Sequence, residues 1–384
     1  MKLTTHGMRR FSGQRTLHAA AALVLMAALA ACSSTSKPKP AELPENPATF
    51  AVKEAWKIQG PAVDFPLALD VSGDTVTMAG AEGVVVAIDA RTGKELWRAS
   101  AGAPLGAGVG SDGSLAAVVT RDNDLVALSG GKVLWKQRLS AEAYTPPLVA
   151  GRRVFVQTGD RTTSAWDGQS GRRLWIQSRP AESLVLRRPG VLTAVGNTLV
   201  AGLGGRLAGI DPANGASRWE SPIAAPRGTN DVERLVDLTG PLNRVGDNLC
   251  GRAYYASVGC VDATRGVLLW SKPANGAVGI GGDESAIYGT EANGQVMAWR
   301  RNDGSSLWST DRYKYRTLTA PLAAGRAVIF GEQTGWVHFL SRTDGALLNR
   351  VSPDGSAIVA APVLAANTVV VVTAKGTVAG YRPE

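Results

Sequence analysis

Short runs of alternating apolar and polar residues, each followed by turn residues, occupy most of the chain. In the clearest run, residues 84–88, alternate aliphatic side chains fall on one face, which predicts a half-buried strand. Asp89 follows and can accept backbone hydrogen bonds as the chain turns. Gly93 permits a left-handed backbone there, and Trp97 lies on the strand that comes next.

The Asp, Gly and Trp of this motif recur at a constant spacing of four residues. Complete copies are Asp89-Gly93-Trp97, Asp167-Gly171-Trp175, Asp211-Gly215-Trp219 and Asp262-Gly266-Trp270. Degenerate copies are Arg300-Gly304-Trp308, Ser341-Gly345-Asn349 and a shortened one from Leu125 to Trp135. A Pro followed by an aliphatic residue precedes most copies, for example Pro66-Leu67 and Pro147-Leu148. Each unit therefore predicts four strands joined by turns.

The repeated Trp indicates how the units assemble. An indole can bury on the order of 200 Å² between stacked sheets and still hydrogen bond through its N–H. A single four-stranded sheet cannot bury both faces, so the units must stack, and a closed ring leaves no exposed sheet face at either end. We therefore predict that the repeated Asp and Trp residues hold the sheets together and are not a functional site.

Counting from Trp to Trp gives the number of units. The intervals from Trp97 through 135, 175, 219, 270 and 308 are 38, 40, 44, 51 and 38 residues, close to the roughly 40–50 residues of a propeller blade. The last copy lacks its final strand, and the segment from Val52 to Trp56 resembles the missing one. We predict an all-β fold: an eight-bladed β-propeller over residues 48–384, with four-stranded antiparallel blades and the N-terminal strand closing the last blade. The long 51-residue interval predicts a protruding loop within Ala224–Asp237.

The first 47 residues have a different character. Lys2, Arg9, Arg10 and Arg15 precede an apolar run from Ala19 to Ala31, the layout of a secretory signal. Leu29-Ala30-Ala31-Cys32 resembles the bacterial lipobox, in which the Cys thiol receives a diacylglycerol. We predict a signal peptide over 1–31, lipidation of Cys32, and a flexible tether over 32–47. Ser33, directly after the lipidated Cys, resembles the sorting signal for the outer membrane. We therefore predict that the protein is anchored in the outer membrane and faces the periplasm.

Composition narrows the chemistry. Without the signal, the formal charge falls from +9 to +5, because four basic residues and no acid are lost. The Arg doublets are scattered, so we expect no nucleic-acid partner. Only His338 remains outside the signal, which argues against His-dependent catalysis and against a metal site built from several His. Cys250 and Cys260 lie ten residues apart in an oxidising compartment, and we predict a disulfide between them.

The phrase from Ala87 to Trp97 resembles the tryptophan-docking repeat of pyrroloquinoline-quinone dehydrogenases and of the BamB family of outer-membrane assembly lipoproteins. Both families are eight-bladed propellers, and the lipobox, the length and the N-terminal Trp strand favour BamB. That resemblance implies a non-enzymatic scaffold without a cofactor. The implied partners are the periplasmic domains of the barrel-assembly protein BamA, the other Bam complex lipoproteins and unfolded outer-membrane β-barrel proteins.

Two segments resemble the family's contact surface for BamA. One is Leu-x-Leu-Arg, matched by Leu184, Leu186 and Arg187; the other is Arg-Leu-x-Asp, matched at its acid by Asp237. The second acid of the family pattern is Thr239 here. Apolar side chains beside Arg are typical of interface centres. The alternatives are that both Leu pack inward as strand residues and that Asp237 is a solvated loop carboxylate.

Two other functions remain open from the sequence. A scaffold for another envelope complex would carry the same repeats. A periplasmic quinone-dependent dehydrogenase would need a larger chain, a Ca²⁺ site and, in many members, adjacent cysteines. Nearly all of this chain is predicted to form blades joined by short turns.

Overall fold

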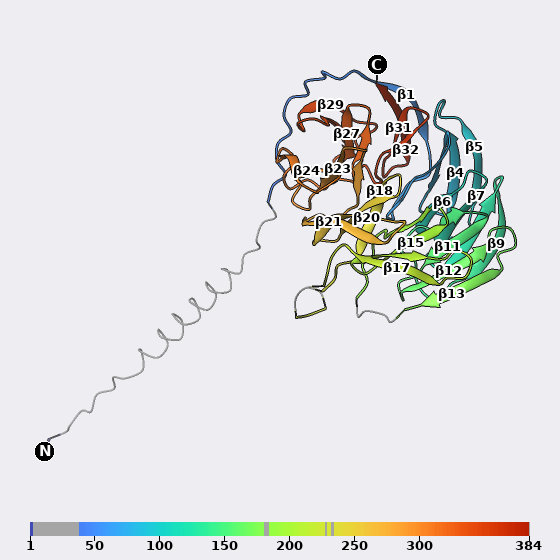
Figure 1. Cartoon of the computed structure of the whole chain (residues 1–384). Helices are drawn as coiled ribbons and strands as arrows, with labels where there is room; N and C mark the ends of the chain where they lie inside the picture. Colours follow the sequence, from blue (N-terminus) through green and yellow to red (C-terminus); the bar gives the residue numbers. More distant parts are fainter. Residues whose placement is uncertain (3–37, 180–183, 227–228, 232–233, 384) are drawn as a thin grey trace. The chain divides into compact units, whose positions relative to one another are not determined.

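The computed structural model describes residues 1–2, 38–179, 184–226, 229–231 and 234–383 (Figure 1). The chain divides into two compact units, Met1–Lys39 and Pro40–Glu384. The second unit contains all 32 strands, arranged in eight four-stranded antiparallel sheets. Cys32 and most of the predicted signal peptide lie outside the described residues. Within the described part, no helix is both long and apolar enough to span a bilayer.

Seven blades are each built from four consecutive strands. Blade 1 contains β2 (Asp70–Ser72), β3 (Thr75–Ala79), β4 (Val84–Asp89) and β5 (Glu95–Ser100), and blade 2 contains β6 (Leu105–Ser111), β7 (Leu115–Thr120), β8 (Asp124–Ser129) and β9 (Lys132–Arg138). Blade 3 contains β10 (Leu148–Ala150), β11 (Arg153–Gln157), β12 (Thr162–Asp167) and β13 (Arg173–Ser178), and blade 4 contains β14 (Leu192–Val195), β15 (Thr198–Leu203), β16 (Arg206–Ile210) and β17 (Ser217–Pro222). Blade 5 contains β18 (Leu238–Val245), β19 (Asn248–Ala253), β20 (Ser257–Asp262) and β21 (Val267–Pro273). Blade 6 contains β22 (Ile280–Gly282), β23 (Ala286–Thr290), β24 (Val296–Arg300) and β25 (Ser306–Thr310). Blade 7 contains β26 (Leu322–Ala324), β27 (Ala327–Gly331), β28 (Val337–Ser341) and β29 (Leu347–Val351).

The eighth blade combines both ends of the propeller. It contains β30 (Val363–Ala365), β31 (Thr368–Val372), β32 (Thr377–Pro383) and, as its outermost strand, β1 (Val52–Gln59). The β1–β32 register runs from Val52 opposite Pro383 to Gln59 opposite Thr377. The predicted fold, including closure by the N-terminal strand, is confirmed.

The repeated Trp docks each blade onto the next one. The Trp135 indole lies against Gly171 of the following blade, where a Cβ would come within 2.6 Å of the ring, and its N–H donates to the Gly168 carbonyl at 2.9 Å. Gly171 has a φ of 69°, so it supplies both the left-handed turn and the space for the indole. Equivalent bonds run from Trp56 to the Ala90 carbonyl, from Trp175 to Pro212, from Trp270 to Arg301 and from Trp308 to Arg342. The structural role predicted for these residues follows from this geometry.

Asn349 replaces Trp in the seventh blade, and the closure explains the exception. The neighbouring eighth blade has no turn before its outermost strand, because that strand comes from the other end of the chain. An indole would therefore lack the Gly turn on which the others rest. Asn349 instead donates through Nδ2 to the Phe50 carbonyl at 2.7 Å, just ahead of β1.

Residues 41–49 form a strap along the outside of the propeller, so this part of the predicted 32–47 tether is not free. The Ala41 carbonyl accepts hydrogen bonds from the Arg316 guanidinium at 2.7 and 2.9 Å. Leu43 packs against the apolar core of blades 6 and 7, and the Asn46 amide donates to the Arg350 carbonyl at 3.1 Å. The compact unit that contains the propeller begins at Pro40.

Blade 5 carries the disulfide and follows the longest connection. Cys250 and Cys260 lie directly opposite each other on β19 and β20 and form a disulfide. The long Trp219–Trp270 interval corresponds to the connection between β17 and β18, residues 223–237, whose described part contains no strand.

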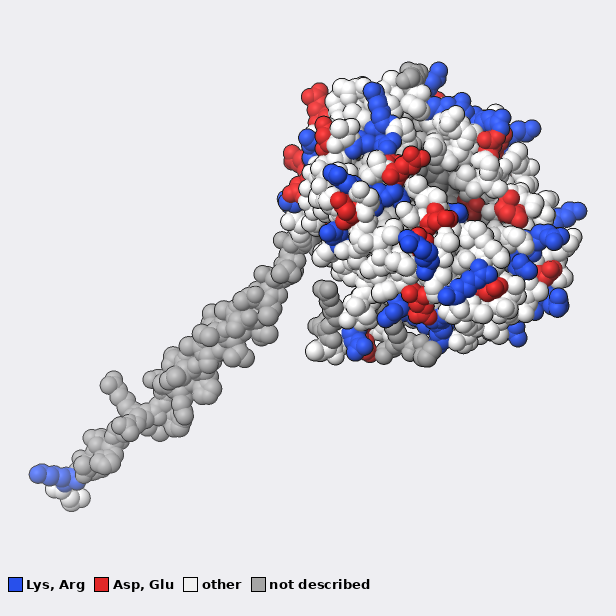
Figure 2. Space-filling model, in the orientation of Figure 1, with Lys and Arg blue, Asp and Glu red and all other residues white. Residues whose placement is uncertain are grey.

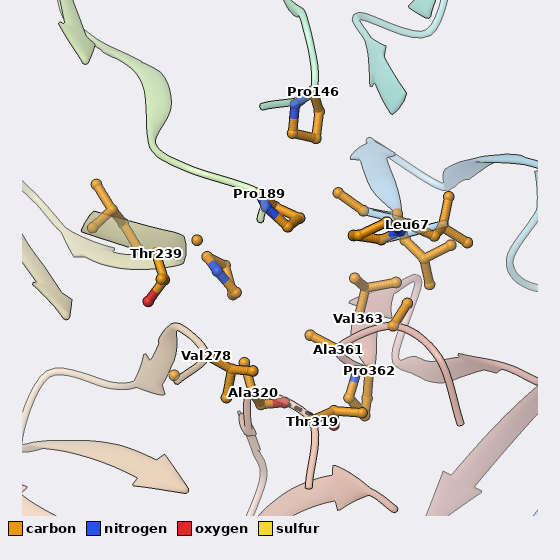
Figure 3. Close-up of a pocket in the computed structure, with 18 of the residues that line it drawn as sticks. Leu67, Pro146, Pro189, Thr239, Val278, Thr319, Ala320, Ala361, Pro362 and Val363 are labelled. Atoms are coloured by element: carbon orange, nitrogen blue, oxygen red, sulfur yellow. Dashed lines mark hydrogen bonds between the residues drawn. The ribbon is translucent and has the colours of Figure 1, made fainter. Parts of the chain in front are cut away.

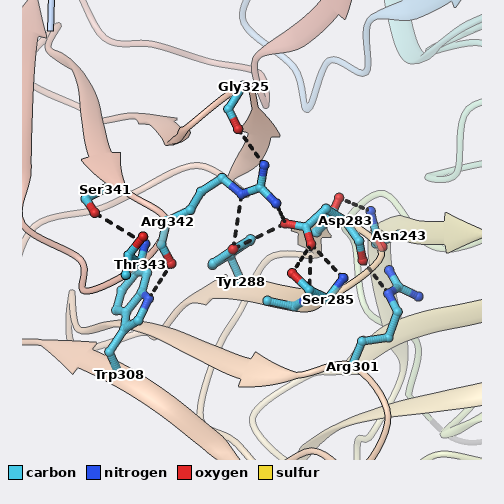
Figure 4. A network of polar contacts seen from close by, with 12 residues as sticks. Asn243, Asp283, Ser285, Tyr288, Arg301, Trp308, Gly325, Ser341, Arg342 and Thr343 are labelled. Carbon is cyan, nitrogen blue, oxygen red and sulfur yellow. Dashed lines mark hydrogen bonds and ion pairs between the residues drawn. The ribbon is translucent and has the colours of Figure 1, made fainter.

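A partly buried polar network joins blades 6 and 7 and reaches the disulfide of blade 5 (Figure 4). The Asp283 carboxylate accepts hydrogen bonds from Ser285 and from the Tyr288 hydroxyl and pairs with Arg342 of blade 7. Arg301 donates to the Asp283 carbonyl and, at 3.2 Å, to the Cys250 sulfur. Burial opposes ionisation of Asp283, but the hydrogen bonds and Arg342 lower its pKa. The network therefore links three successive blades.

Candidate partner-binding site

All segments of the candidate site emerge on one face of the ring. Because the four strands of a blade alternate in direction, the loops between blades and the turns between second and third strands share one face. The turns that carry the Asp and Gly motif lie on the opposite face. The docking face therefore collects loop 139–147, the described parts of loops 179–191 and 223–237, and the turns 158–161 and 254–256, all from blades 3 to 5 or their connections.

The Leu-x-Leu-Arg segment lies in the loop between β13 and β14 and is not part of a strand. Leu184 is 40% exposed, Leu186 is partly buried, and Arg187 is exposed. The alternative, in which both Leu pack inward as strand residues, therefore does not describe this loop. It presents an apolar side chain and a guanidinium to solvent on the docking face.

Asp237 supports this loop from below. Its carboxylate is only 6% exposed; Oδ1 lies 2.7 Å from the Arg161 guanidinium, and Oδ2 accepts the Leu186 backbone N–H at 2.8 Å. The alternative of a solvated loop carboxylate does not fit this burial. Asp237 therefore contacts Leu186 as a buried residue that fixes the position of the loop.

Arg187 is held by two residues from the connection between β9 and β10. Its guanidinium lies over the Tyr144 ring at 5.6 Å from the centroid and 3.4 Å from a Glu142 carboxylate oxygen. The Tyr144 hydroxyl also donates to Glu142. Burial and the hydrogen bond to Glu142 raise the pKa of Tyr144, so the phenol stays neutral and remains a donor.

Sequence reasoning missed Arg161, Glu142 and Tyr144. Each belongs to a different turn or loop from its partner, and pairing between loops of neighbouring blades leaves no regular spacing in the sequence. One sign was available for Arg161: it stands in a turn of the repeat where five other blades have Gly, and its φ of 63° is uncommon for a side chain of this size.

Two hollows adjoin the site, and neither has the character of a catalytic pocket. A cavity of about 40 Å³ beneath Leu186 is lined by Thr145, Arg161 and Asp237; it has room for only a few water molecules. The central channel, of about 810 Å³, is walled mainly by apolar residues, including Leu67, Pro189 and Pro362 (Figure 3).

The channel accounts for two sequence features. The Pro-aliphatic pairs lie in or just before the innermost strands of six blades, and most of them line the channel. Thr239, at the position of the family's second acid, is 1% exposed and belongs to the channel wall. A charged contact at residue 239 is therefore not part of the docking face.

The remaining candidate groups for chemistry are buried or bonded. His338 is fully buried, with Nε2 3.4 Å from the Glu332 carboxylate, and burial lowers its pKa. Among the described residues, no three His, Cys, Asp or Glu side chains cluster as a metal site would require. On the face drawn in Figure 2, basic and acidic side chains are interspersed.

Comparisons with known proteins agree with this architecture. The family model described as outer membrane protein assembly factor BamB matches residues 81–310. The outer membrane protein assembly factor BamB of Burkholderia pseudomallei strain K96243 is 39% identical over 371 residues, covering 95% of this chain and 97% of that protein. The BamB of Bordetella pertussis strain Tohama I is 35% identical over 383 residues, covering 98% and 99%.

A solved structure shares the fold. The crystal structure of BamB from Moraxella catarrhalis superimposes with a TM-score of 0.78 at 24% identity, covering 86% of this chain and all of that one. Repeat, ring closure and full-length similarity thus point the same way: the chain belongs to the family of the outer membrane protein assembly factor BamB.

Proposed function

We propose that this protein is a non-enzymatic scaffold of outer-membrane β-barrel assembly that binds the periplasmic domains of BamA through the docking face. Membership of the family supports the role in assembly. The lipobox supports attachment to the outer membrane through acylated Cys32, with the propeller in the periplasm. The other Bam complex lipoproteins are its expected neighbours.

One observation carries the choice of surface. The buried Arg161–Asp237 pair holds the backbone of Leu186, while Glu142 and Tyr144 hold Arg187. An exposed loop that would otherwise be free to move is thus fixed before any partner arrives. A surface fixed in this way loses less conformational entropy on binding.

The same geometry argues for binding rather than catalysis. The only imidazole in the propeller is buried, both of its cysteines form the disulfide, and the channel wall is mainly apolar. We infer that the chain needs no cofactor. Titration of the purified protein with pyrroloquinoline quinone, followed by absorbance, should show no saturable binding.

A second role, binding unfolded β-barrel chains along blade edges, is favoured by one feature of the structure. The outermost strands expose aliphatic side chains, including Leu96, Ile176, Val267 and Leu307. The edge of β29 is already paired with an extended segment, because the Thr49 and Phe50 backbone N–H groups donate to the Leu348 carbonyl. Free edges of this kind carry unpaired amides that can accept a further strand.

Two charge-changing substitutions test the docking face. Leu186→Asp places a carboxylate in the apolar centre, and Arg187→Glu reverses the exposed cation beside Glu142. Either should abolish co-purification of BamA, while the thermal unfolding transition of Arg187→Glu stays within about 2 °C because Arg187 is exposed. Leu96→Asp, on the outer edge of blade 1, is the matched control and should retain BamA. Retention of BamA by both docking-face variants would contradict the proposal.

A further inference from the structure

The eight equivalent turns between second and third strands can be compared within this one chain. Each contains a residue with positive φ. It is Gly in five blades, Asn in one, and a large side chain in the other two: Gly83, Gly204, Gly294, Gly335, Gly376, Asn123, Arg161 and Tyr255. A left-handed backbone is unfavourable for a large side chain and is kept where surrounding structure enforces it, often at functional sites. The two exceptions lie in blades 3 and 5, the blades that flank the docking loops.

Arg161 already has an explanation in its buried pair with Asp237. Tyr255 has no such internal role. Its φ is 49°, its side chain is 49% exposed, and its ring meets Tyr254 edge-on at a centroid distance of 4.4 Å. An aromatic pair is thus held at the surface of a strained turn.

The turn is connected to the docking loop through Asp237. The Tyr254 N–H donates to the Asp237 carbonyl at 2.9 Å, while the Asp237 carboxylate accepts the Leu186 N–H at 2.8 Å. The Tyr255 N–H donates to the Gly276 carbonyl at 3.0 Å, which anchors the other side of the turn. One buried residue therefore sets the positions of both Leu186 and the tyrosine pair.

Arg188 of the docking loop lies near Tyr255. It is exposed, and it is close enough to Tyr255 to act on its ionisation: burial and Tyr254 raise the pKa of Tyr255, and Arg188 opposes the shift. Among the described side chains, no carboxylate forms an ion pair with Arg188. Tyr and Arg side chains around an apolar centre are typical of the residues that contribute most of the binding energy of an interface.

We propose that the Tyr254–Tyr255 turn is the second half of the docking surface, and that this surface takes a partner segment presenting an apolar side chain flanked by carboxylates. The inference rests on the proposed function and deepens it. The apolar group would lie between Leu186 and the Tyr255 ring, and Arg188 would pair with a carboxylate. The positive character of Arg187 and Arg188 excludes a basic segment, since like charges repel across an interface.

Tyr255→Gly tests this assignment without damaging the fold. Glycine is the residue that five other blades use in this turn, so the thermal transition should stay or rise while the aromatic ring is lost. Affinity of the mature protein for the purified periplasmic domains of BamA, measured by calorimetry, should fall at least about tenfold. Arg188→Gln should also weaken binding and should reduce its dependence on salt.

Tyr315→Gly is the matched control. Tyr315 also has positive φ, 61°, is 50% exposed, and lies on the same face in the loop after β25, between blades 6 and 7 and outside the docking loops. Its substitution should leave affinity unchanged. Equal affinity for wild type and Tyr255→Gly, with binding still abolished by Leu186→Asp, would overturn the second half of the surface and leave the proposed function standing. Absence of binding by the wild type would overturn both.

Discussion

Single residues in this propeller take their roles from the neighbouring blade. Trp135 and Asn349 occupy the same position in the repeat, yet one rests on a Gly turn and the other reaches the chain preceding β1. Asp237 would be an ordinary loop acid if Arg161 did not face it from another blade. Removing one partner of such a buried pair costs about 3–5 kcal/mol because the other charge is left unpaired.

Asp70 provides a pH-dependent prediction at this scale. It begins β2 and lines the channel, where burial raises its pKa to about 6, opposed by a Ser111 backbone hydrogen bond and assisted by Asp112. The unfolded chain releases this proton near pH 4, and the folded chain near pH 6. Ionisation of Asp70 therefore lowers the free energy of unfolding as the pH rises from about 4 to about 6, and this loss of stability is complete above pH 6.

Asp70→Asn should consequently raise the free energy of unfolding at pH 7.5, by at most about 3 kcal/mol, and the gain should vanish near pH 4. Urea unfolding at pH 4, 6 and 7.5 measures it. Asp122→Asn, at an exposed turn, controls for the change in net charge. A gain that is constant across these three pH values would be inconsistent with a buried carboxyl at position 70.

At the scale of strands and turns, much could be predicted because the repeat is local. Alternating side chains, the Asp and Gly turn, and the Trp intervals led to eight blades and to closure by residues 52–56, all confirmed. The strap was not predicted, since its contacts join Ala41 to Arg316, 275 residues away. The burial of Asp237 was missed for the same reason: it depends on a turn from a blade that the loop sequence does not identify.

The docked indoles allow a comparison between two otherwise similar elements. Trp135 donates to the Gly168 carbonyl, whereas the buried Trp219 N–H finds no acceptor among the described residues. Both indoles rest on the Gly of the next blade. Trp135→Phe should therefore lower the free energy of unfolding by about 1 kcal/mol more than Trp219→Phe, measured by urea unfolding. Equal losses would mean that the indole hydrogen bond contributes nothing to blade docking.

For the whole molecule, ring closure converts local loops into one rigid surface. The docking face draws on blades 3, 4 and 5, and their relative positions are fixed only if β1 completes the eighth sheet. The strap contacts Lys314 in the loop after β25, on that same face. We propose that Cys32 is acylated, and the nine residues from Cys32 to Ala41 span about 30 Å at most when fully extended. If the lipid anchor and the BamA partner that we propose are both correct, the docking face stays near the membrane of that partner.

Site-specific photocrosslinking in living cells tests the central claim most directly. A photoreactive amino acid at Leu184, in the exposed docking loop, should give a covalent adduct with BamA. The same group at Leu96, equally exposed on the outer edge of blade 1, should give none with BamA. BamA adducts from position 96 but not from position 184 would show that another surface of the ring binds the partner and would contradict the account.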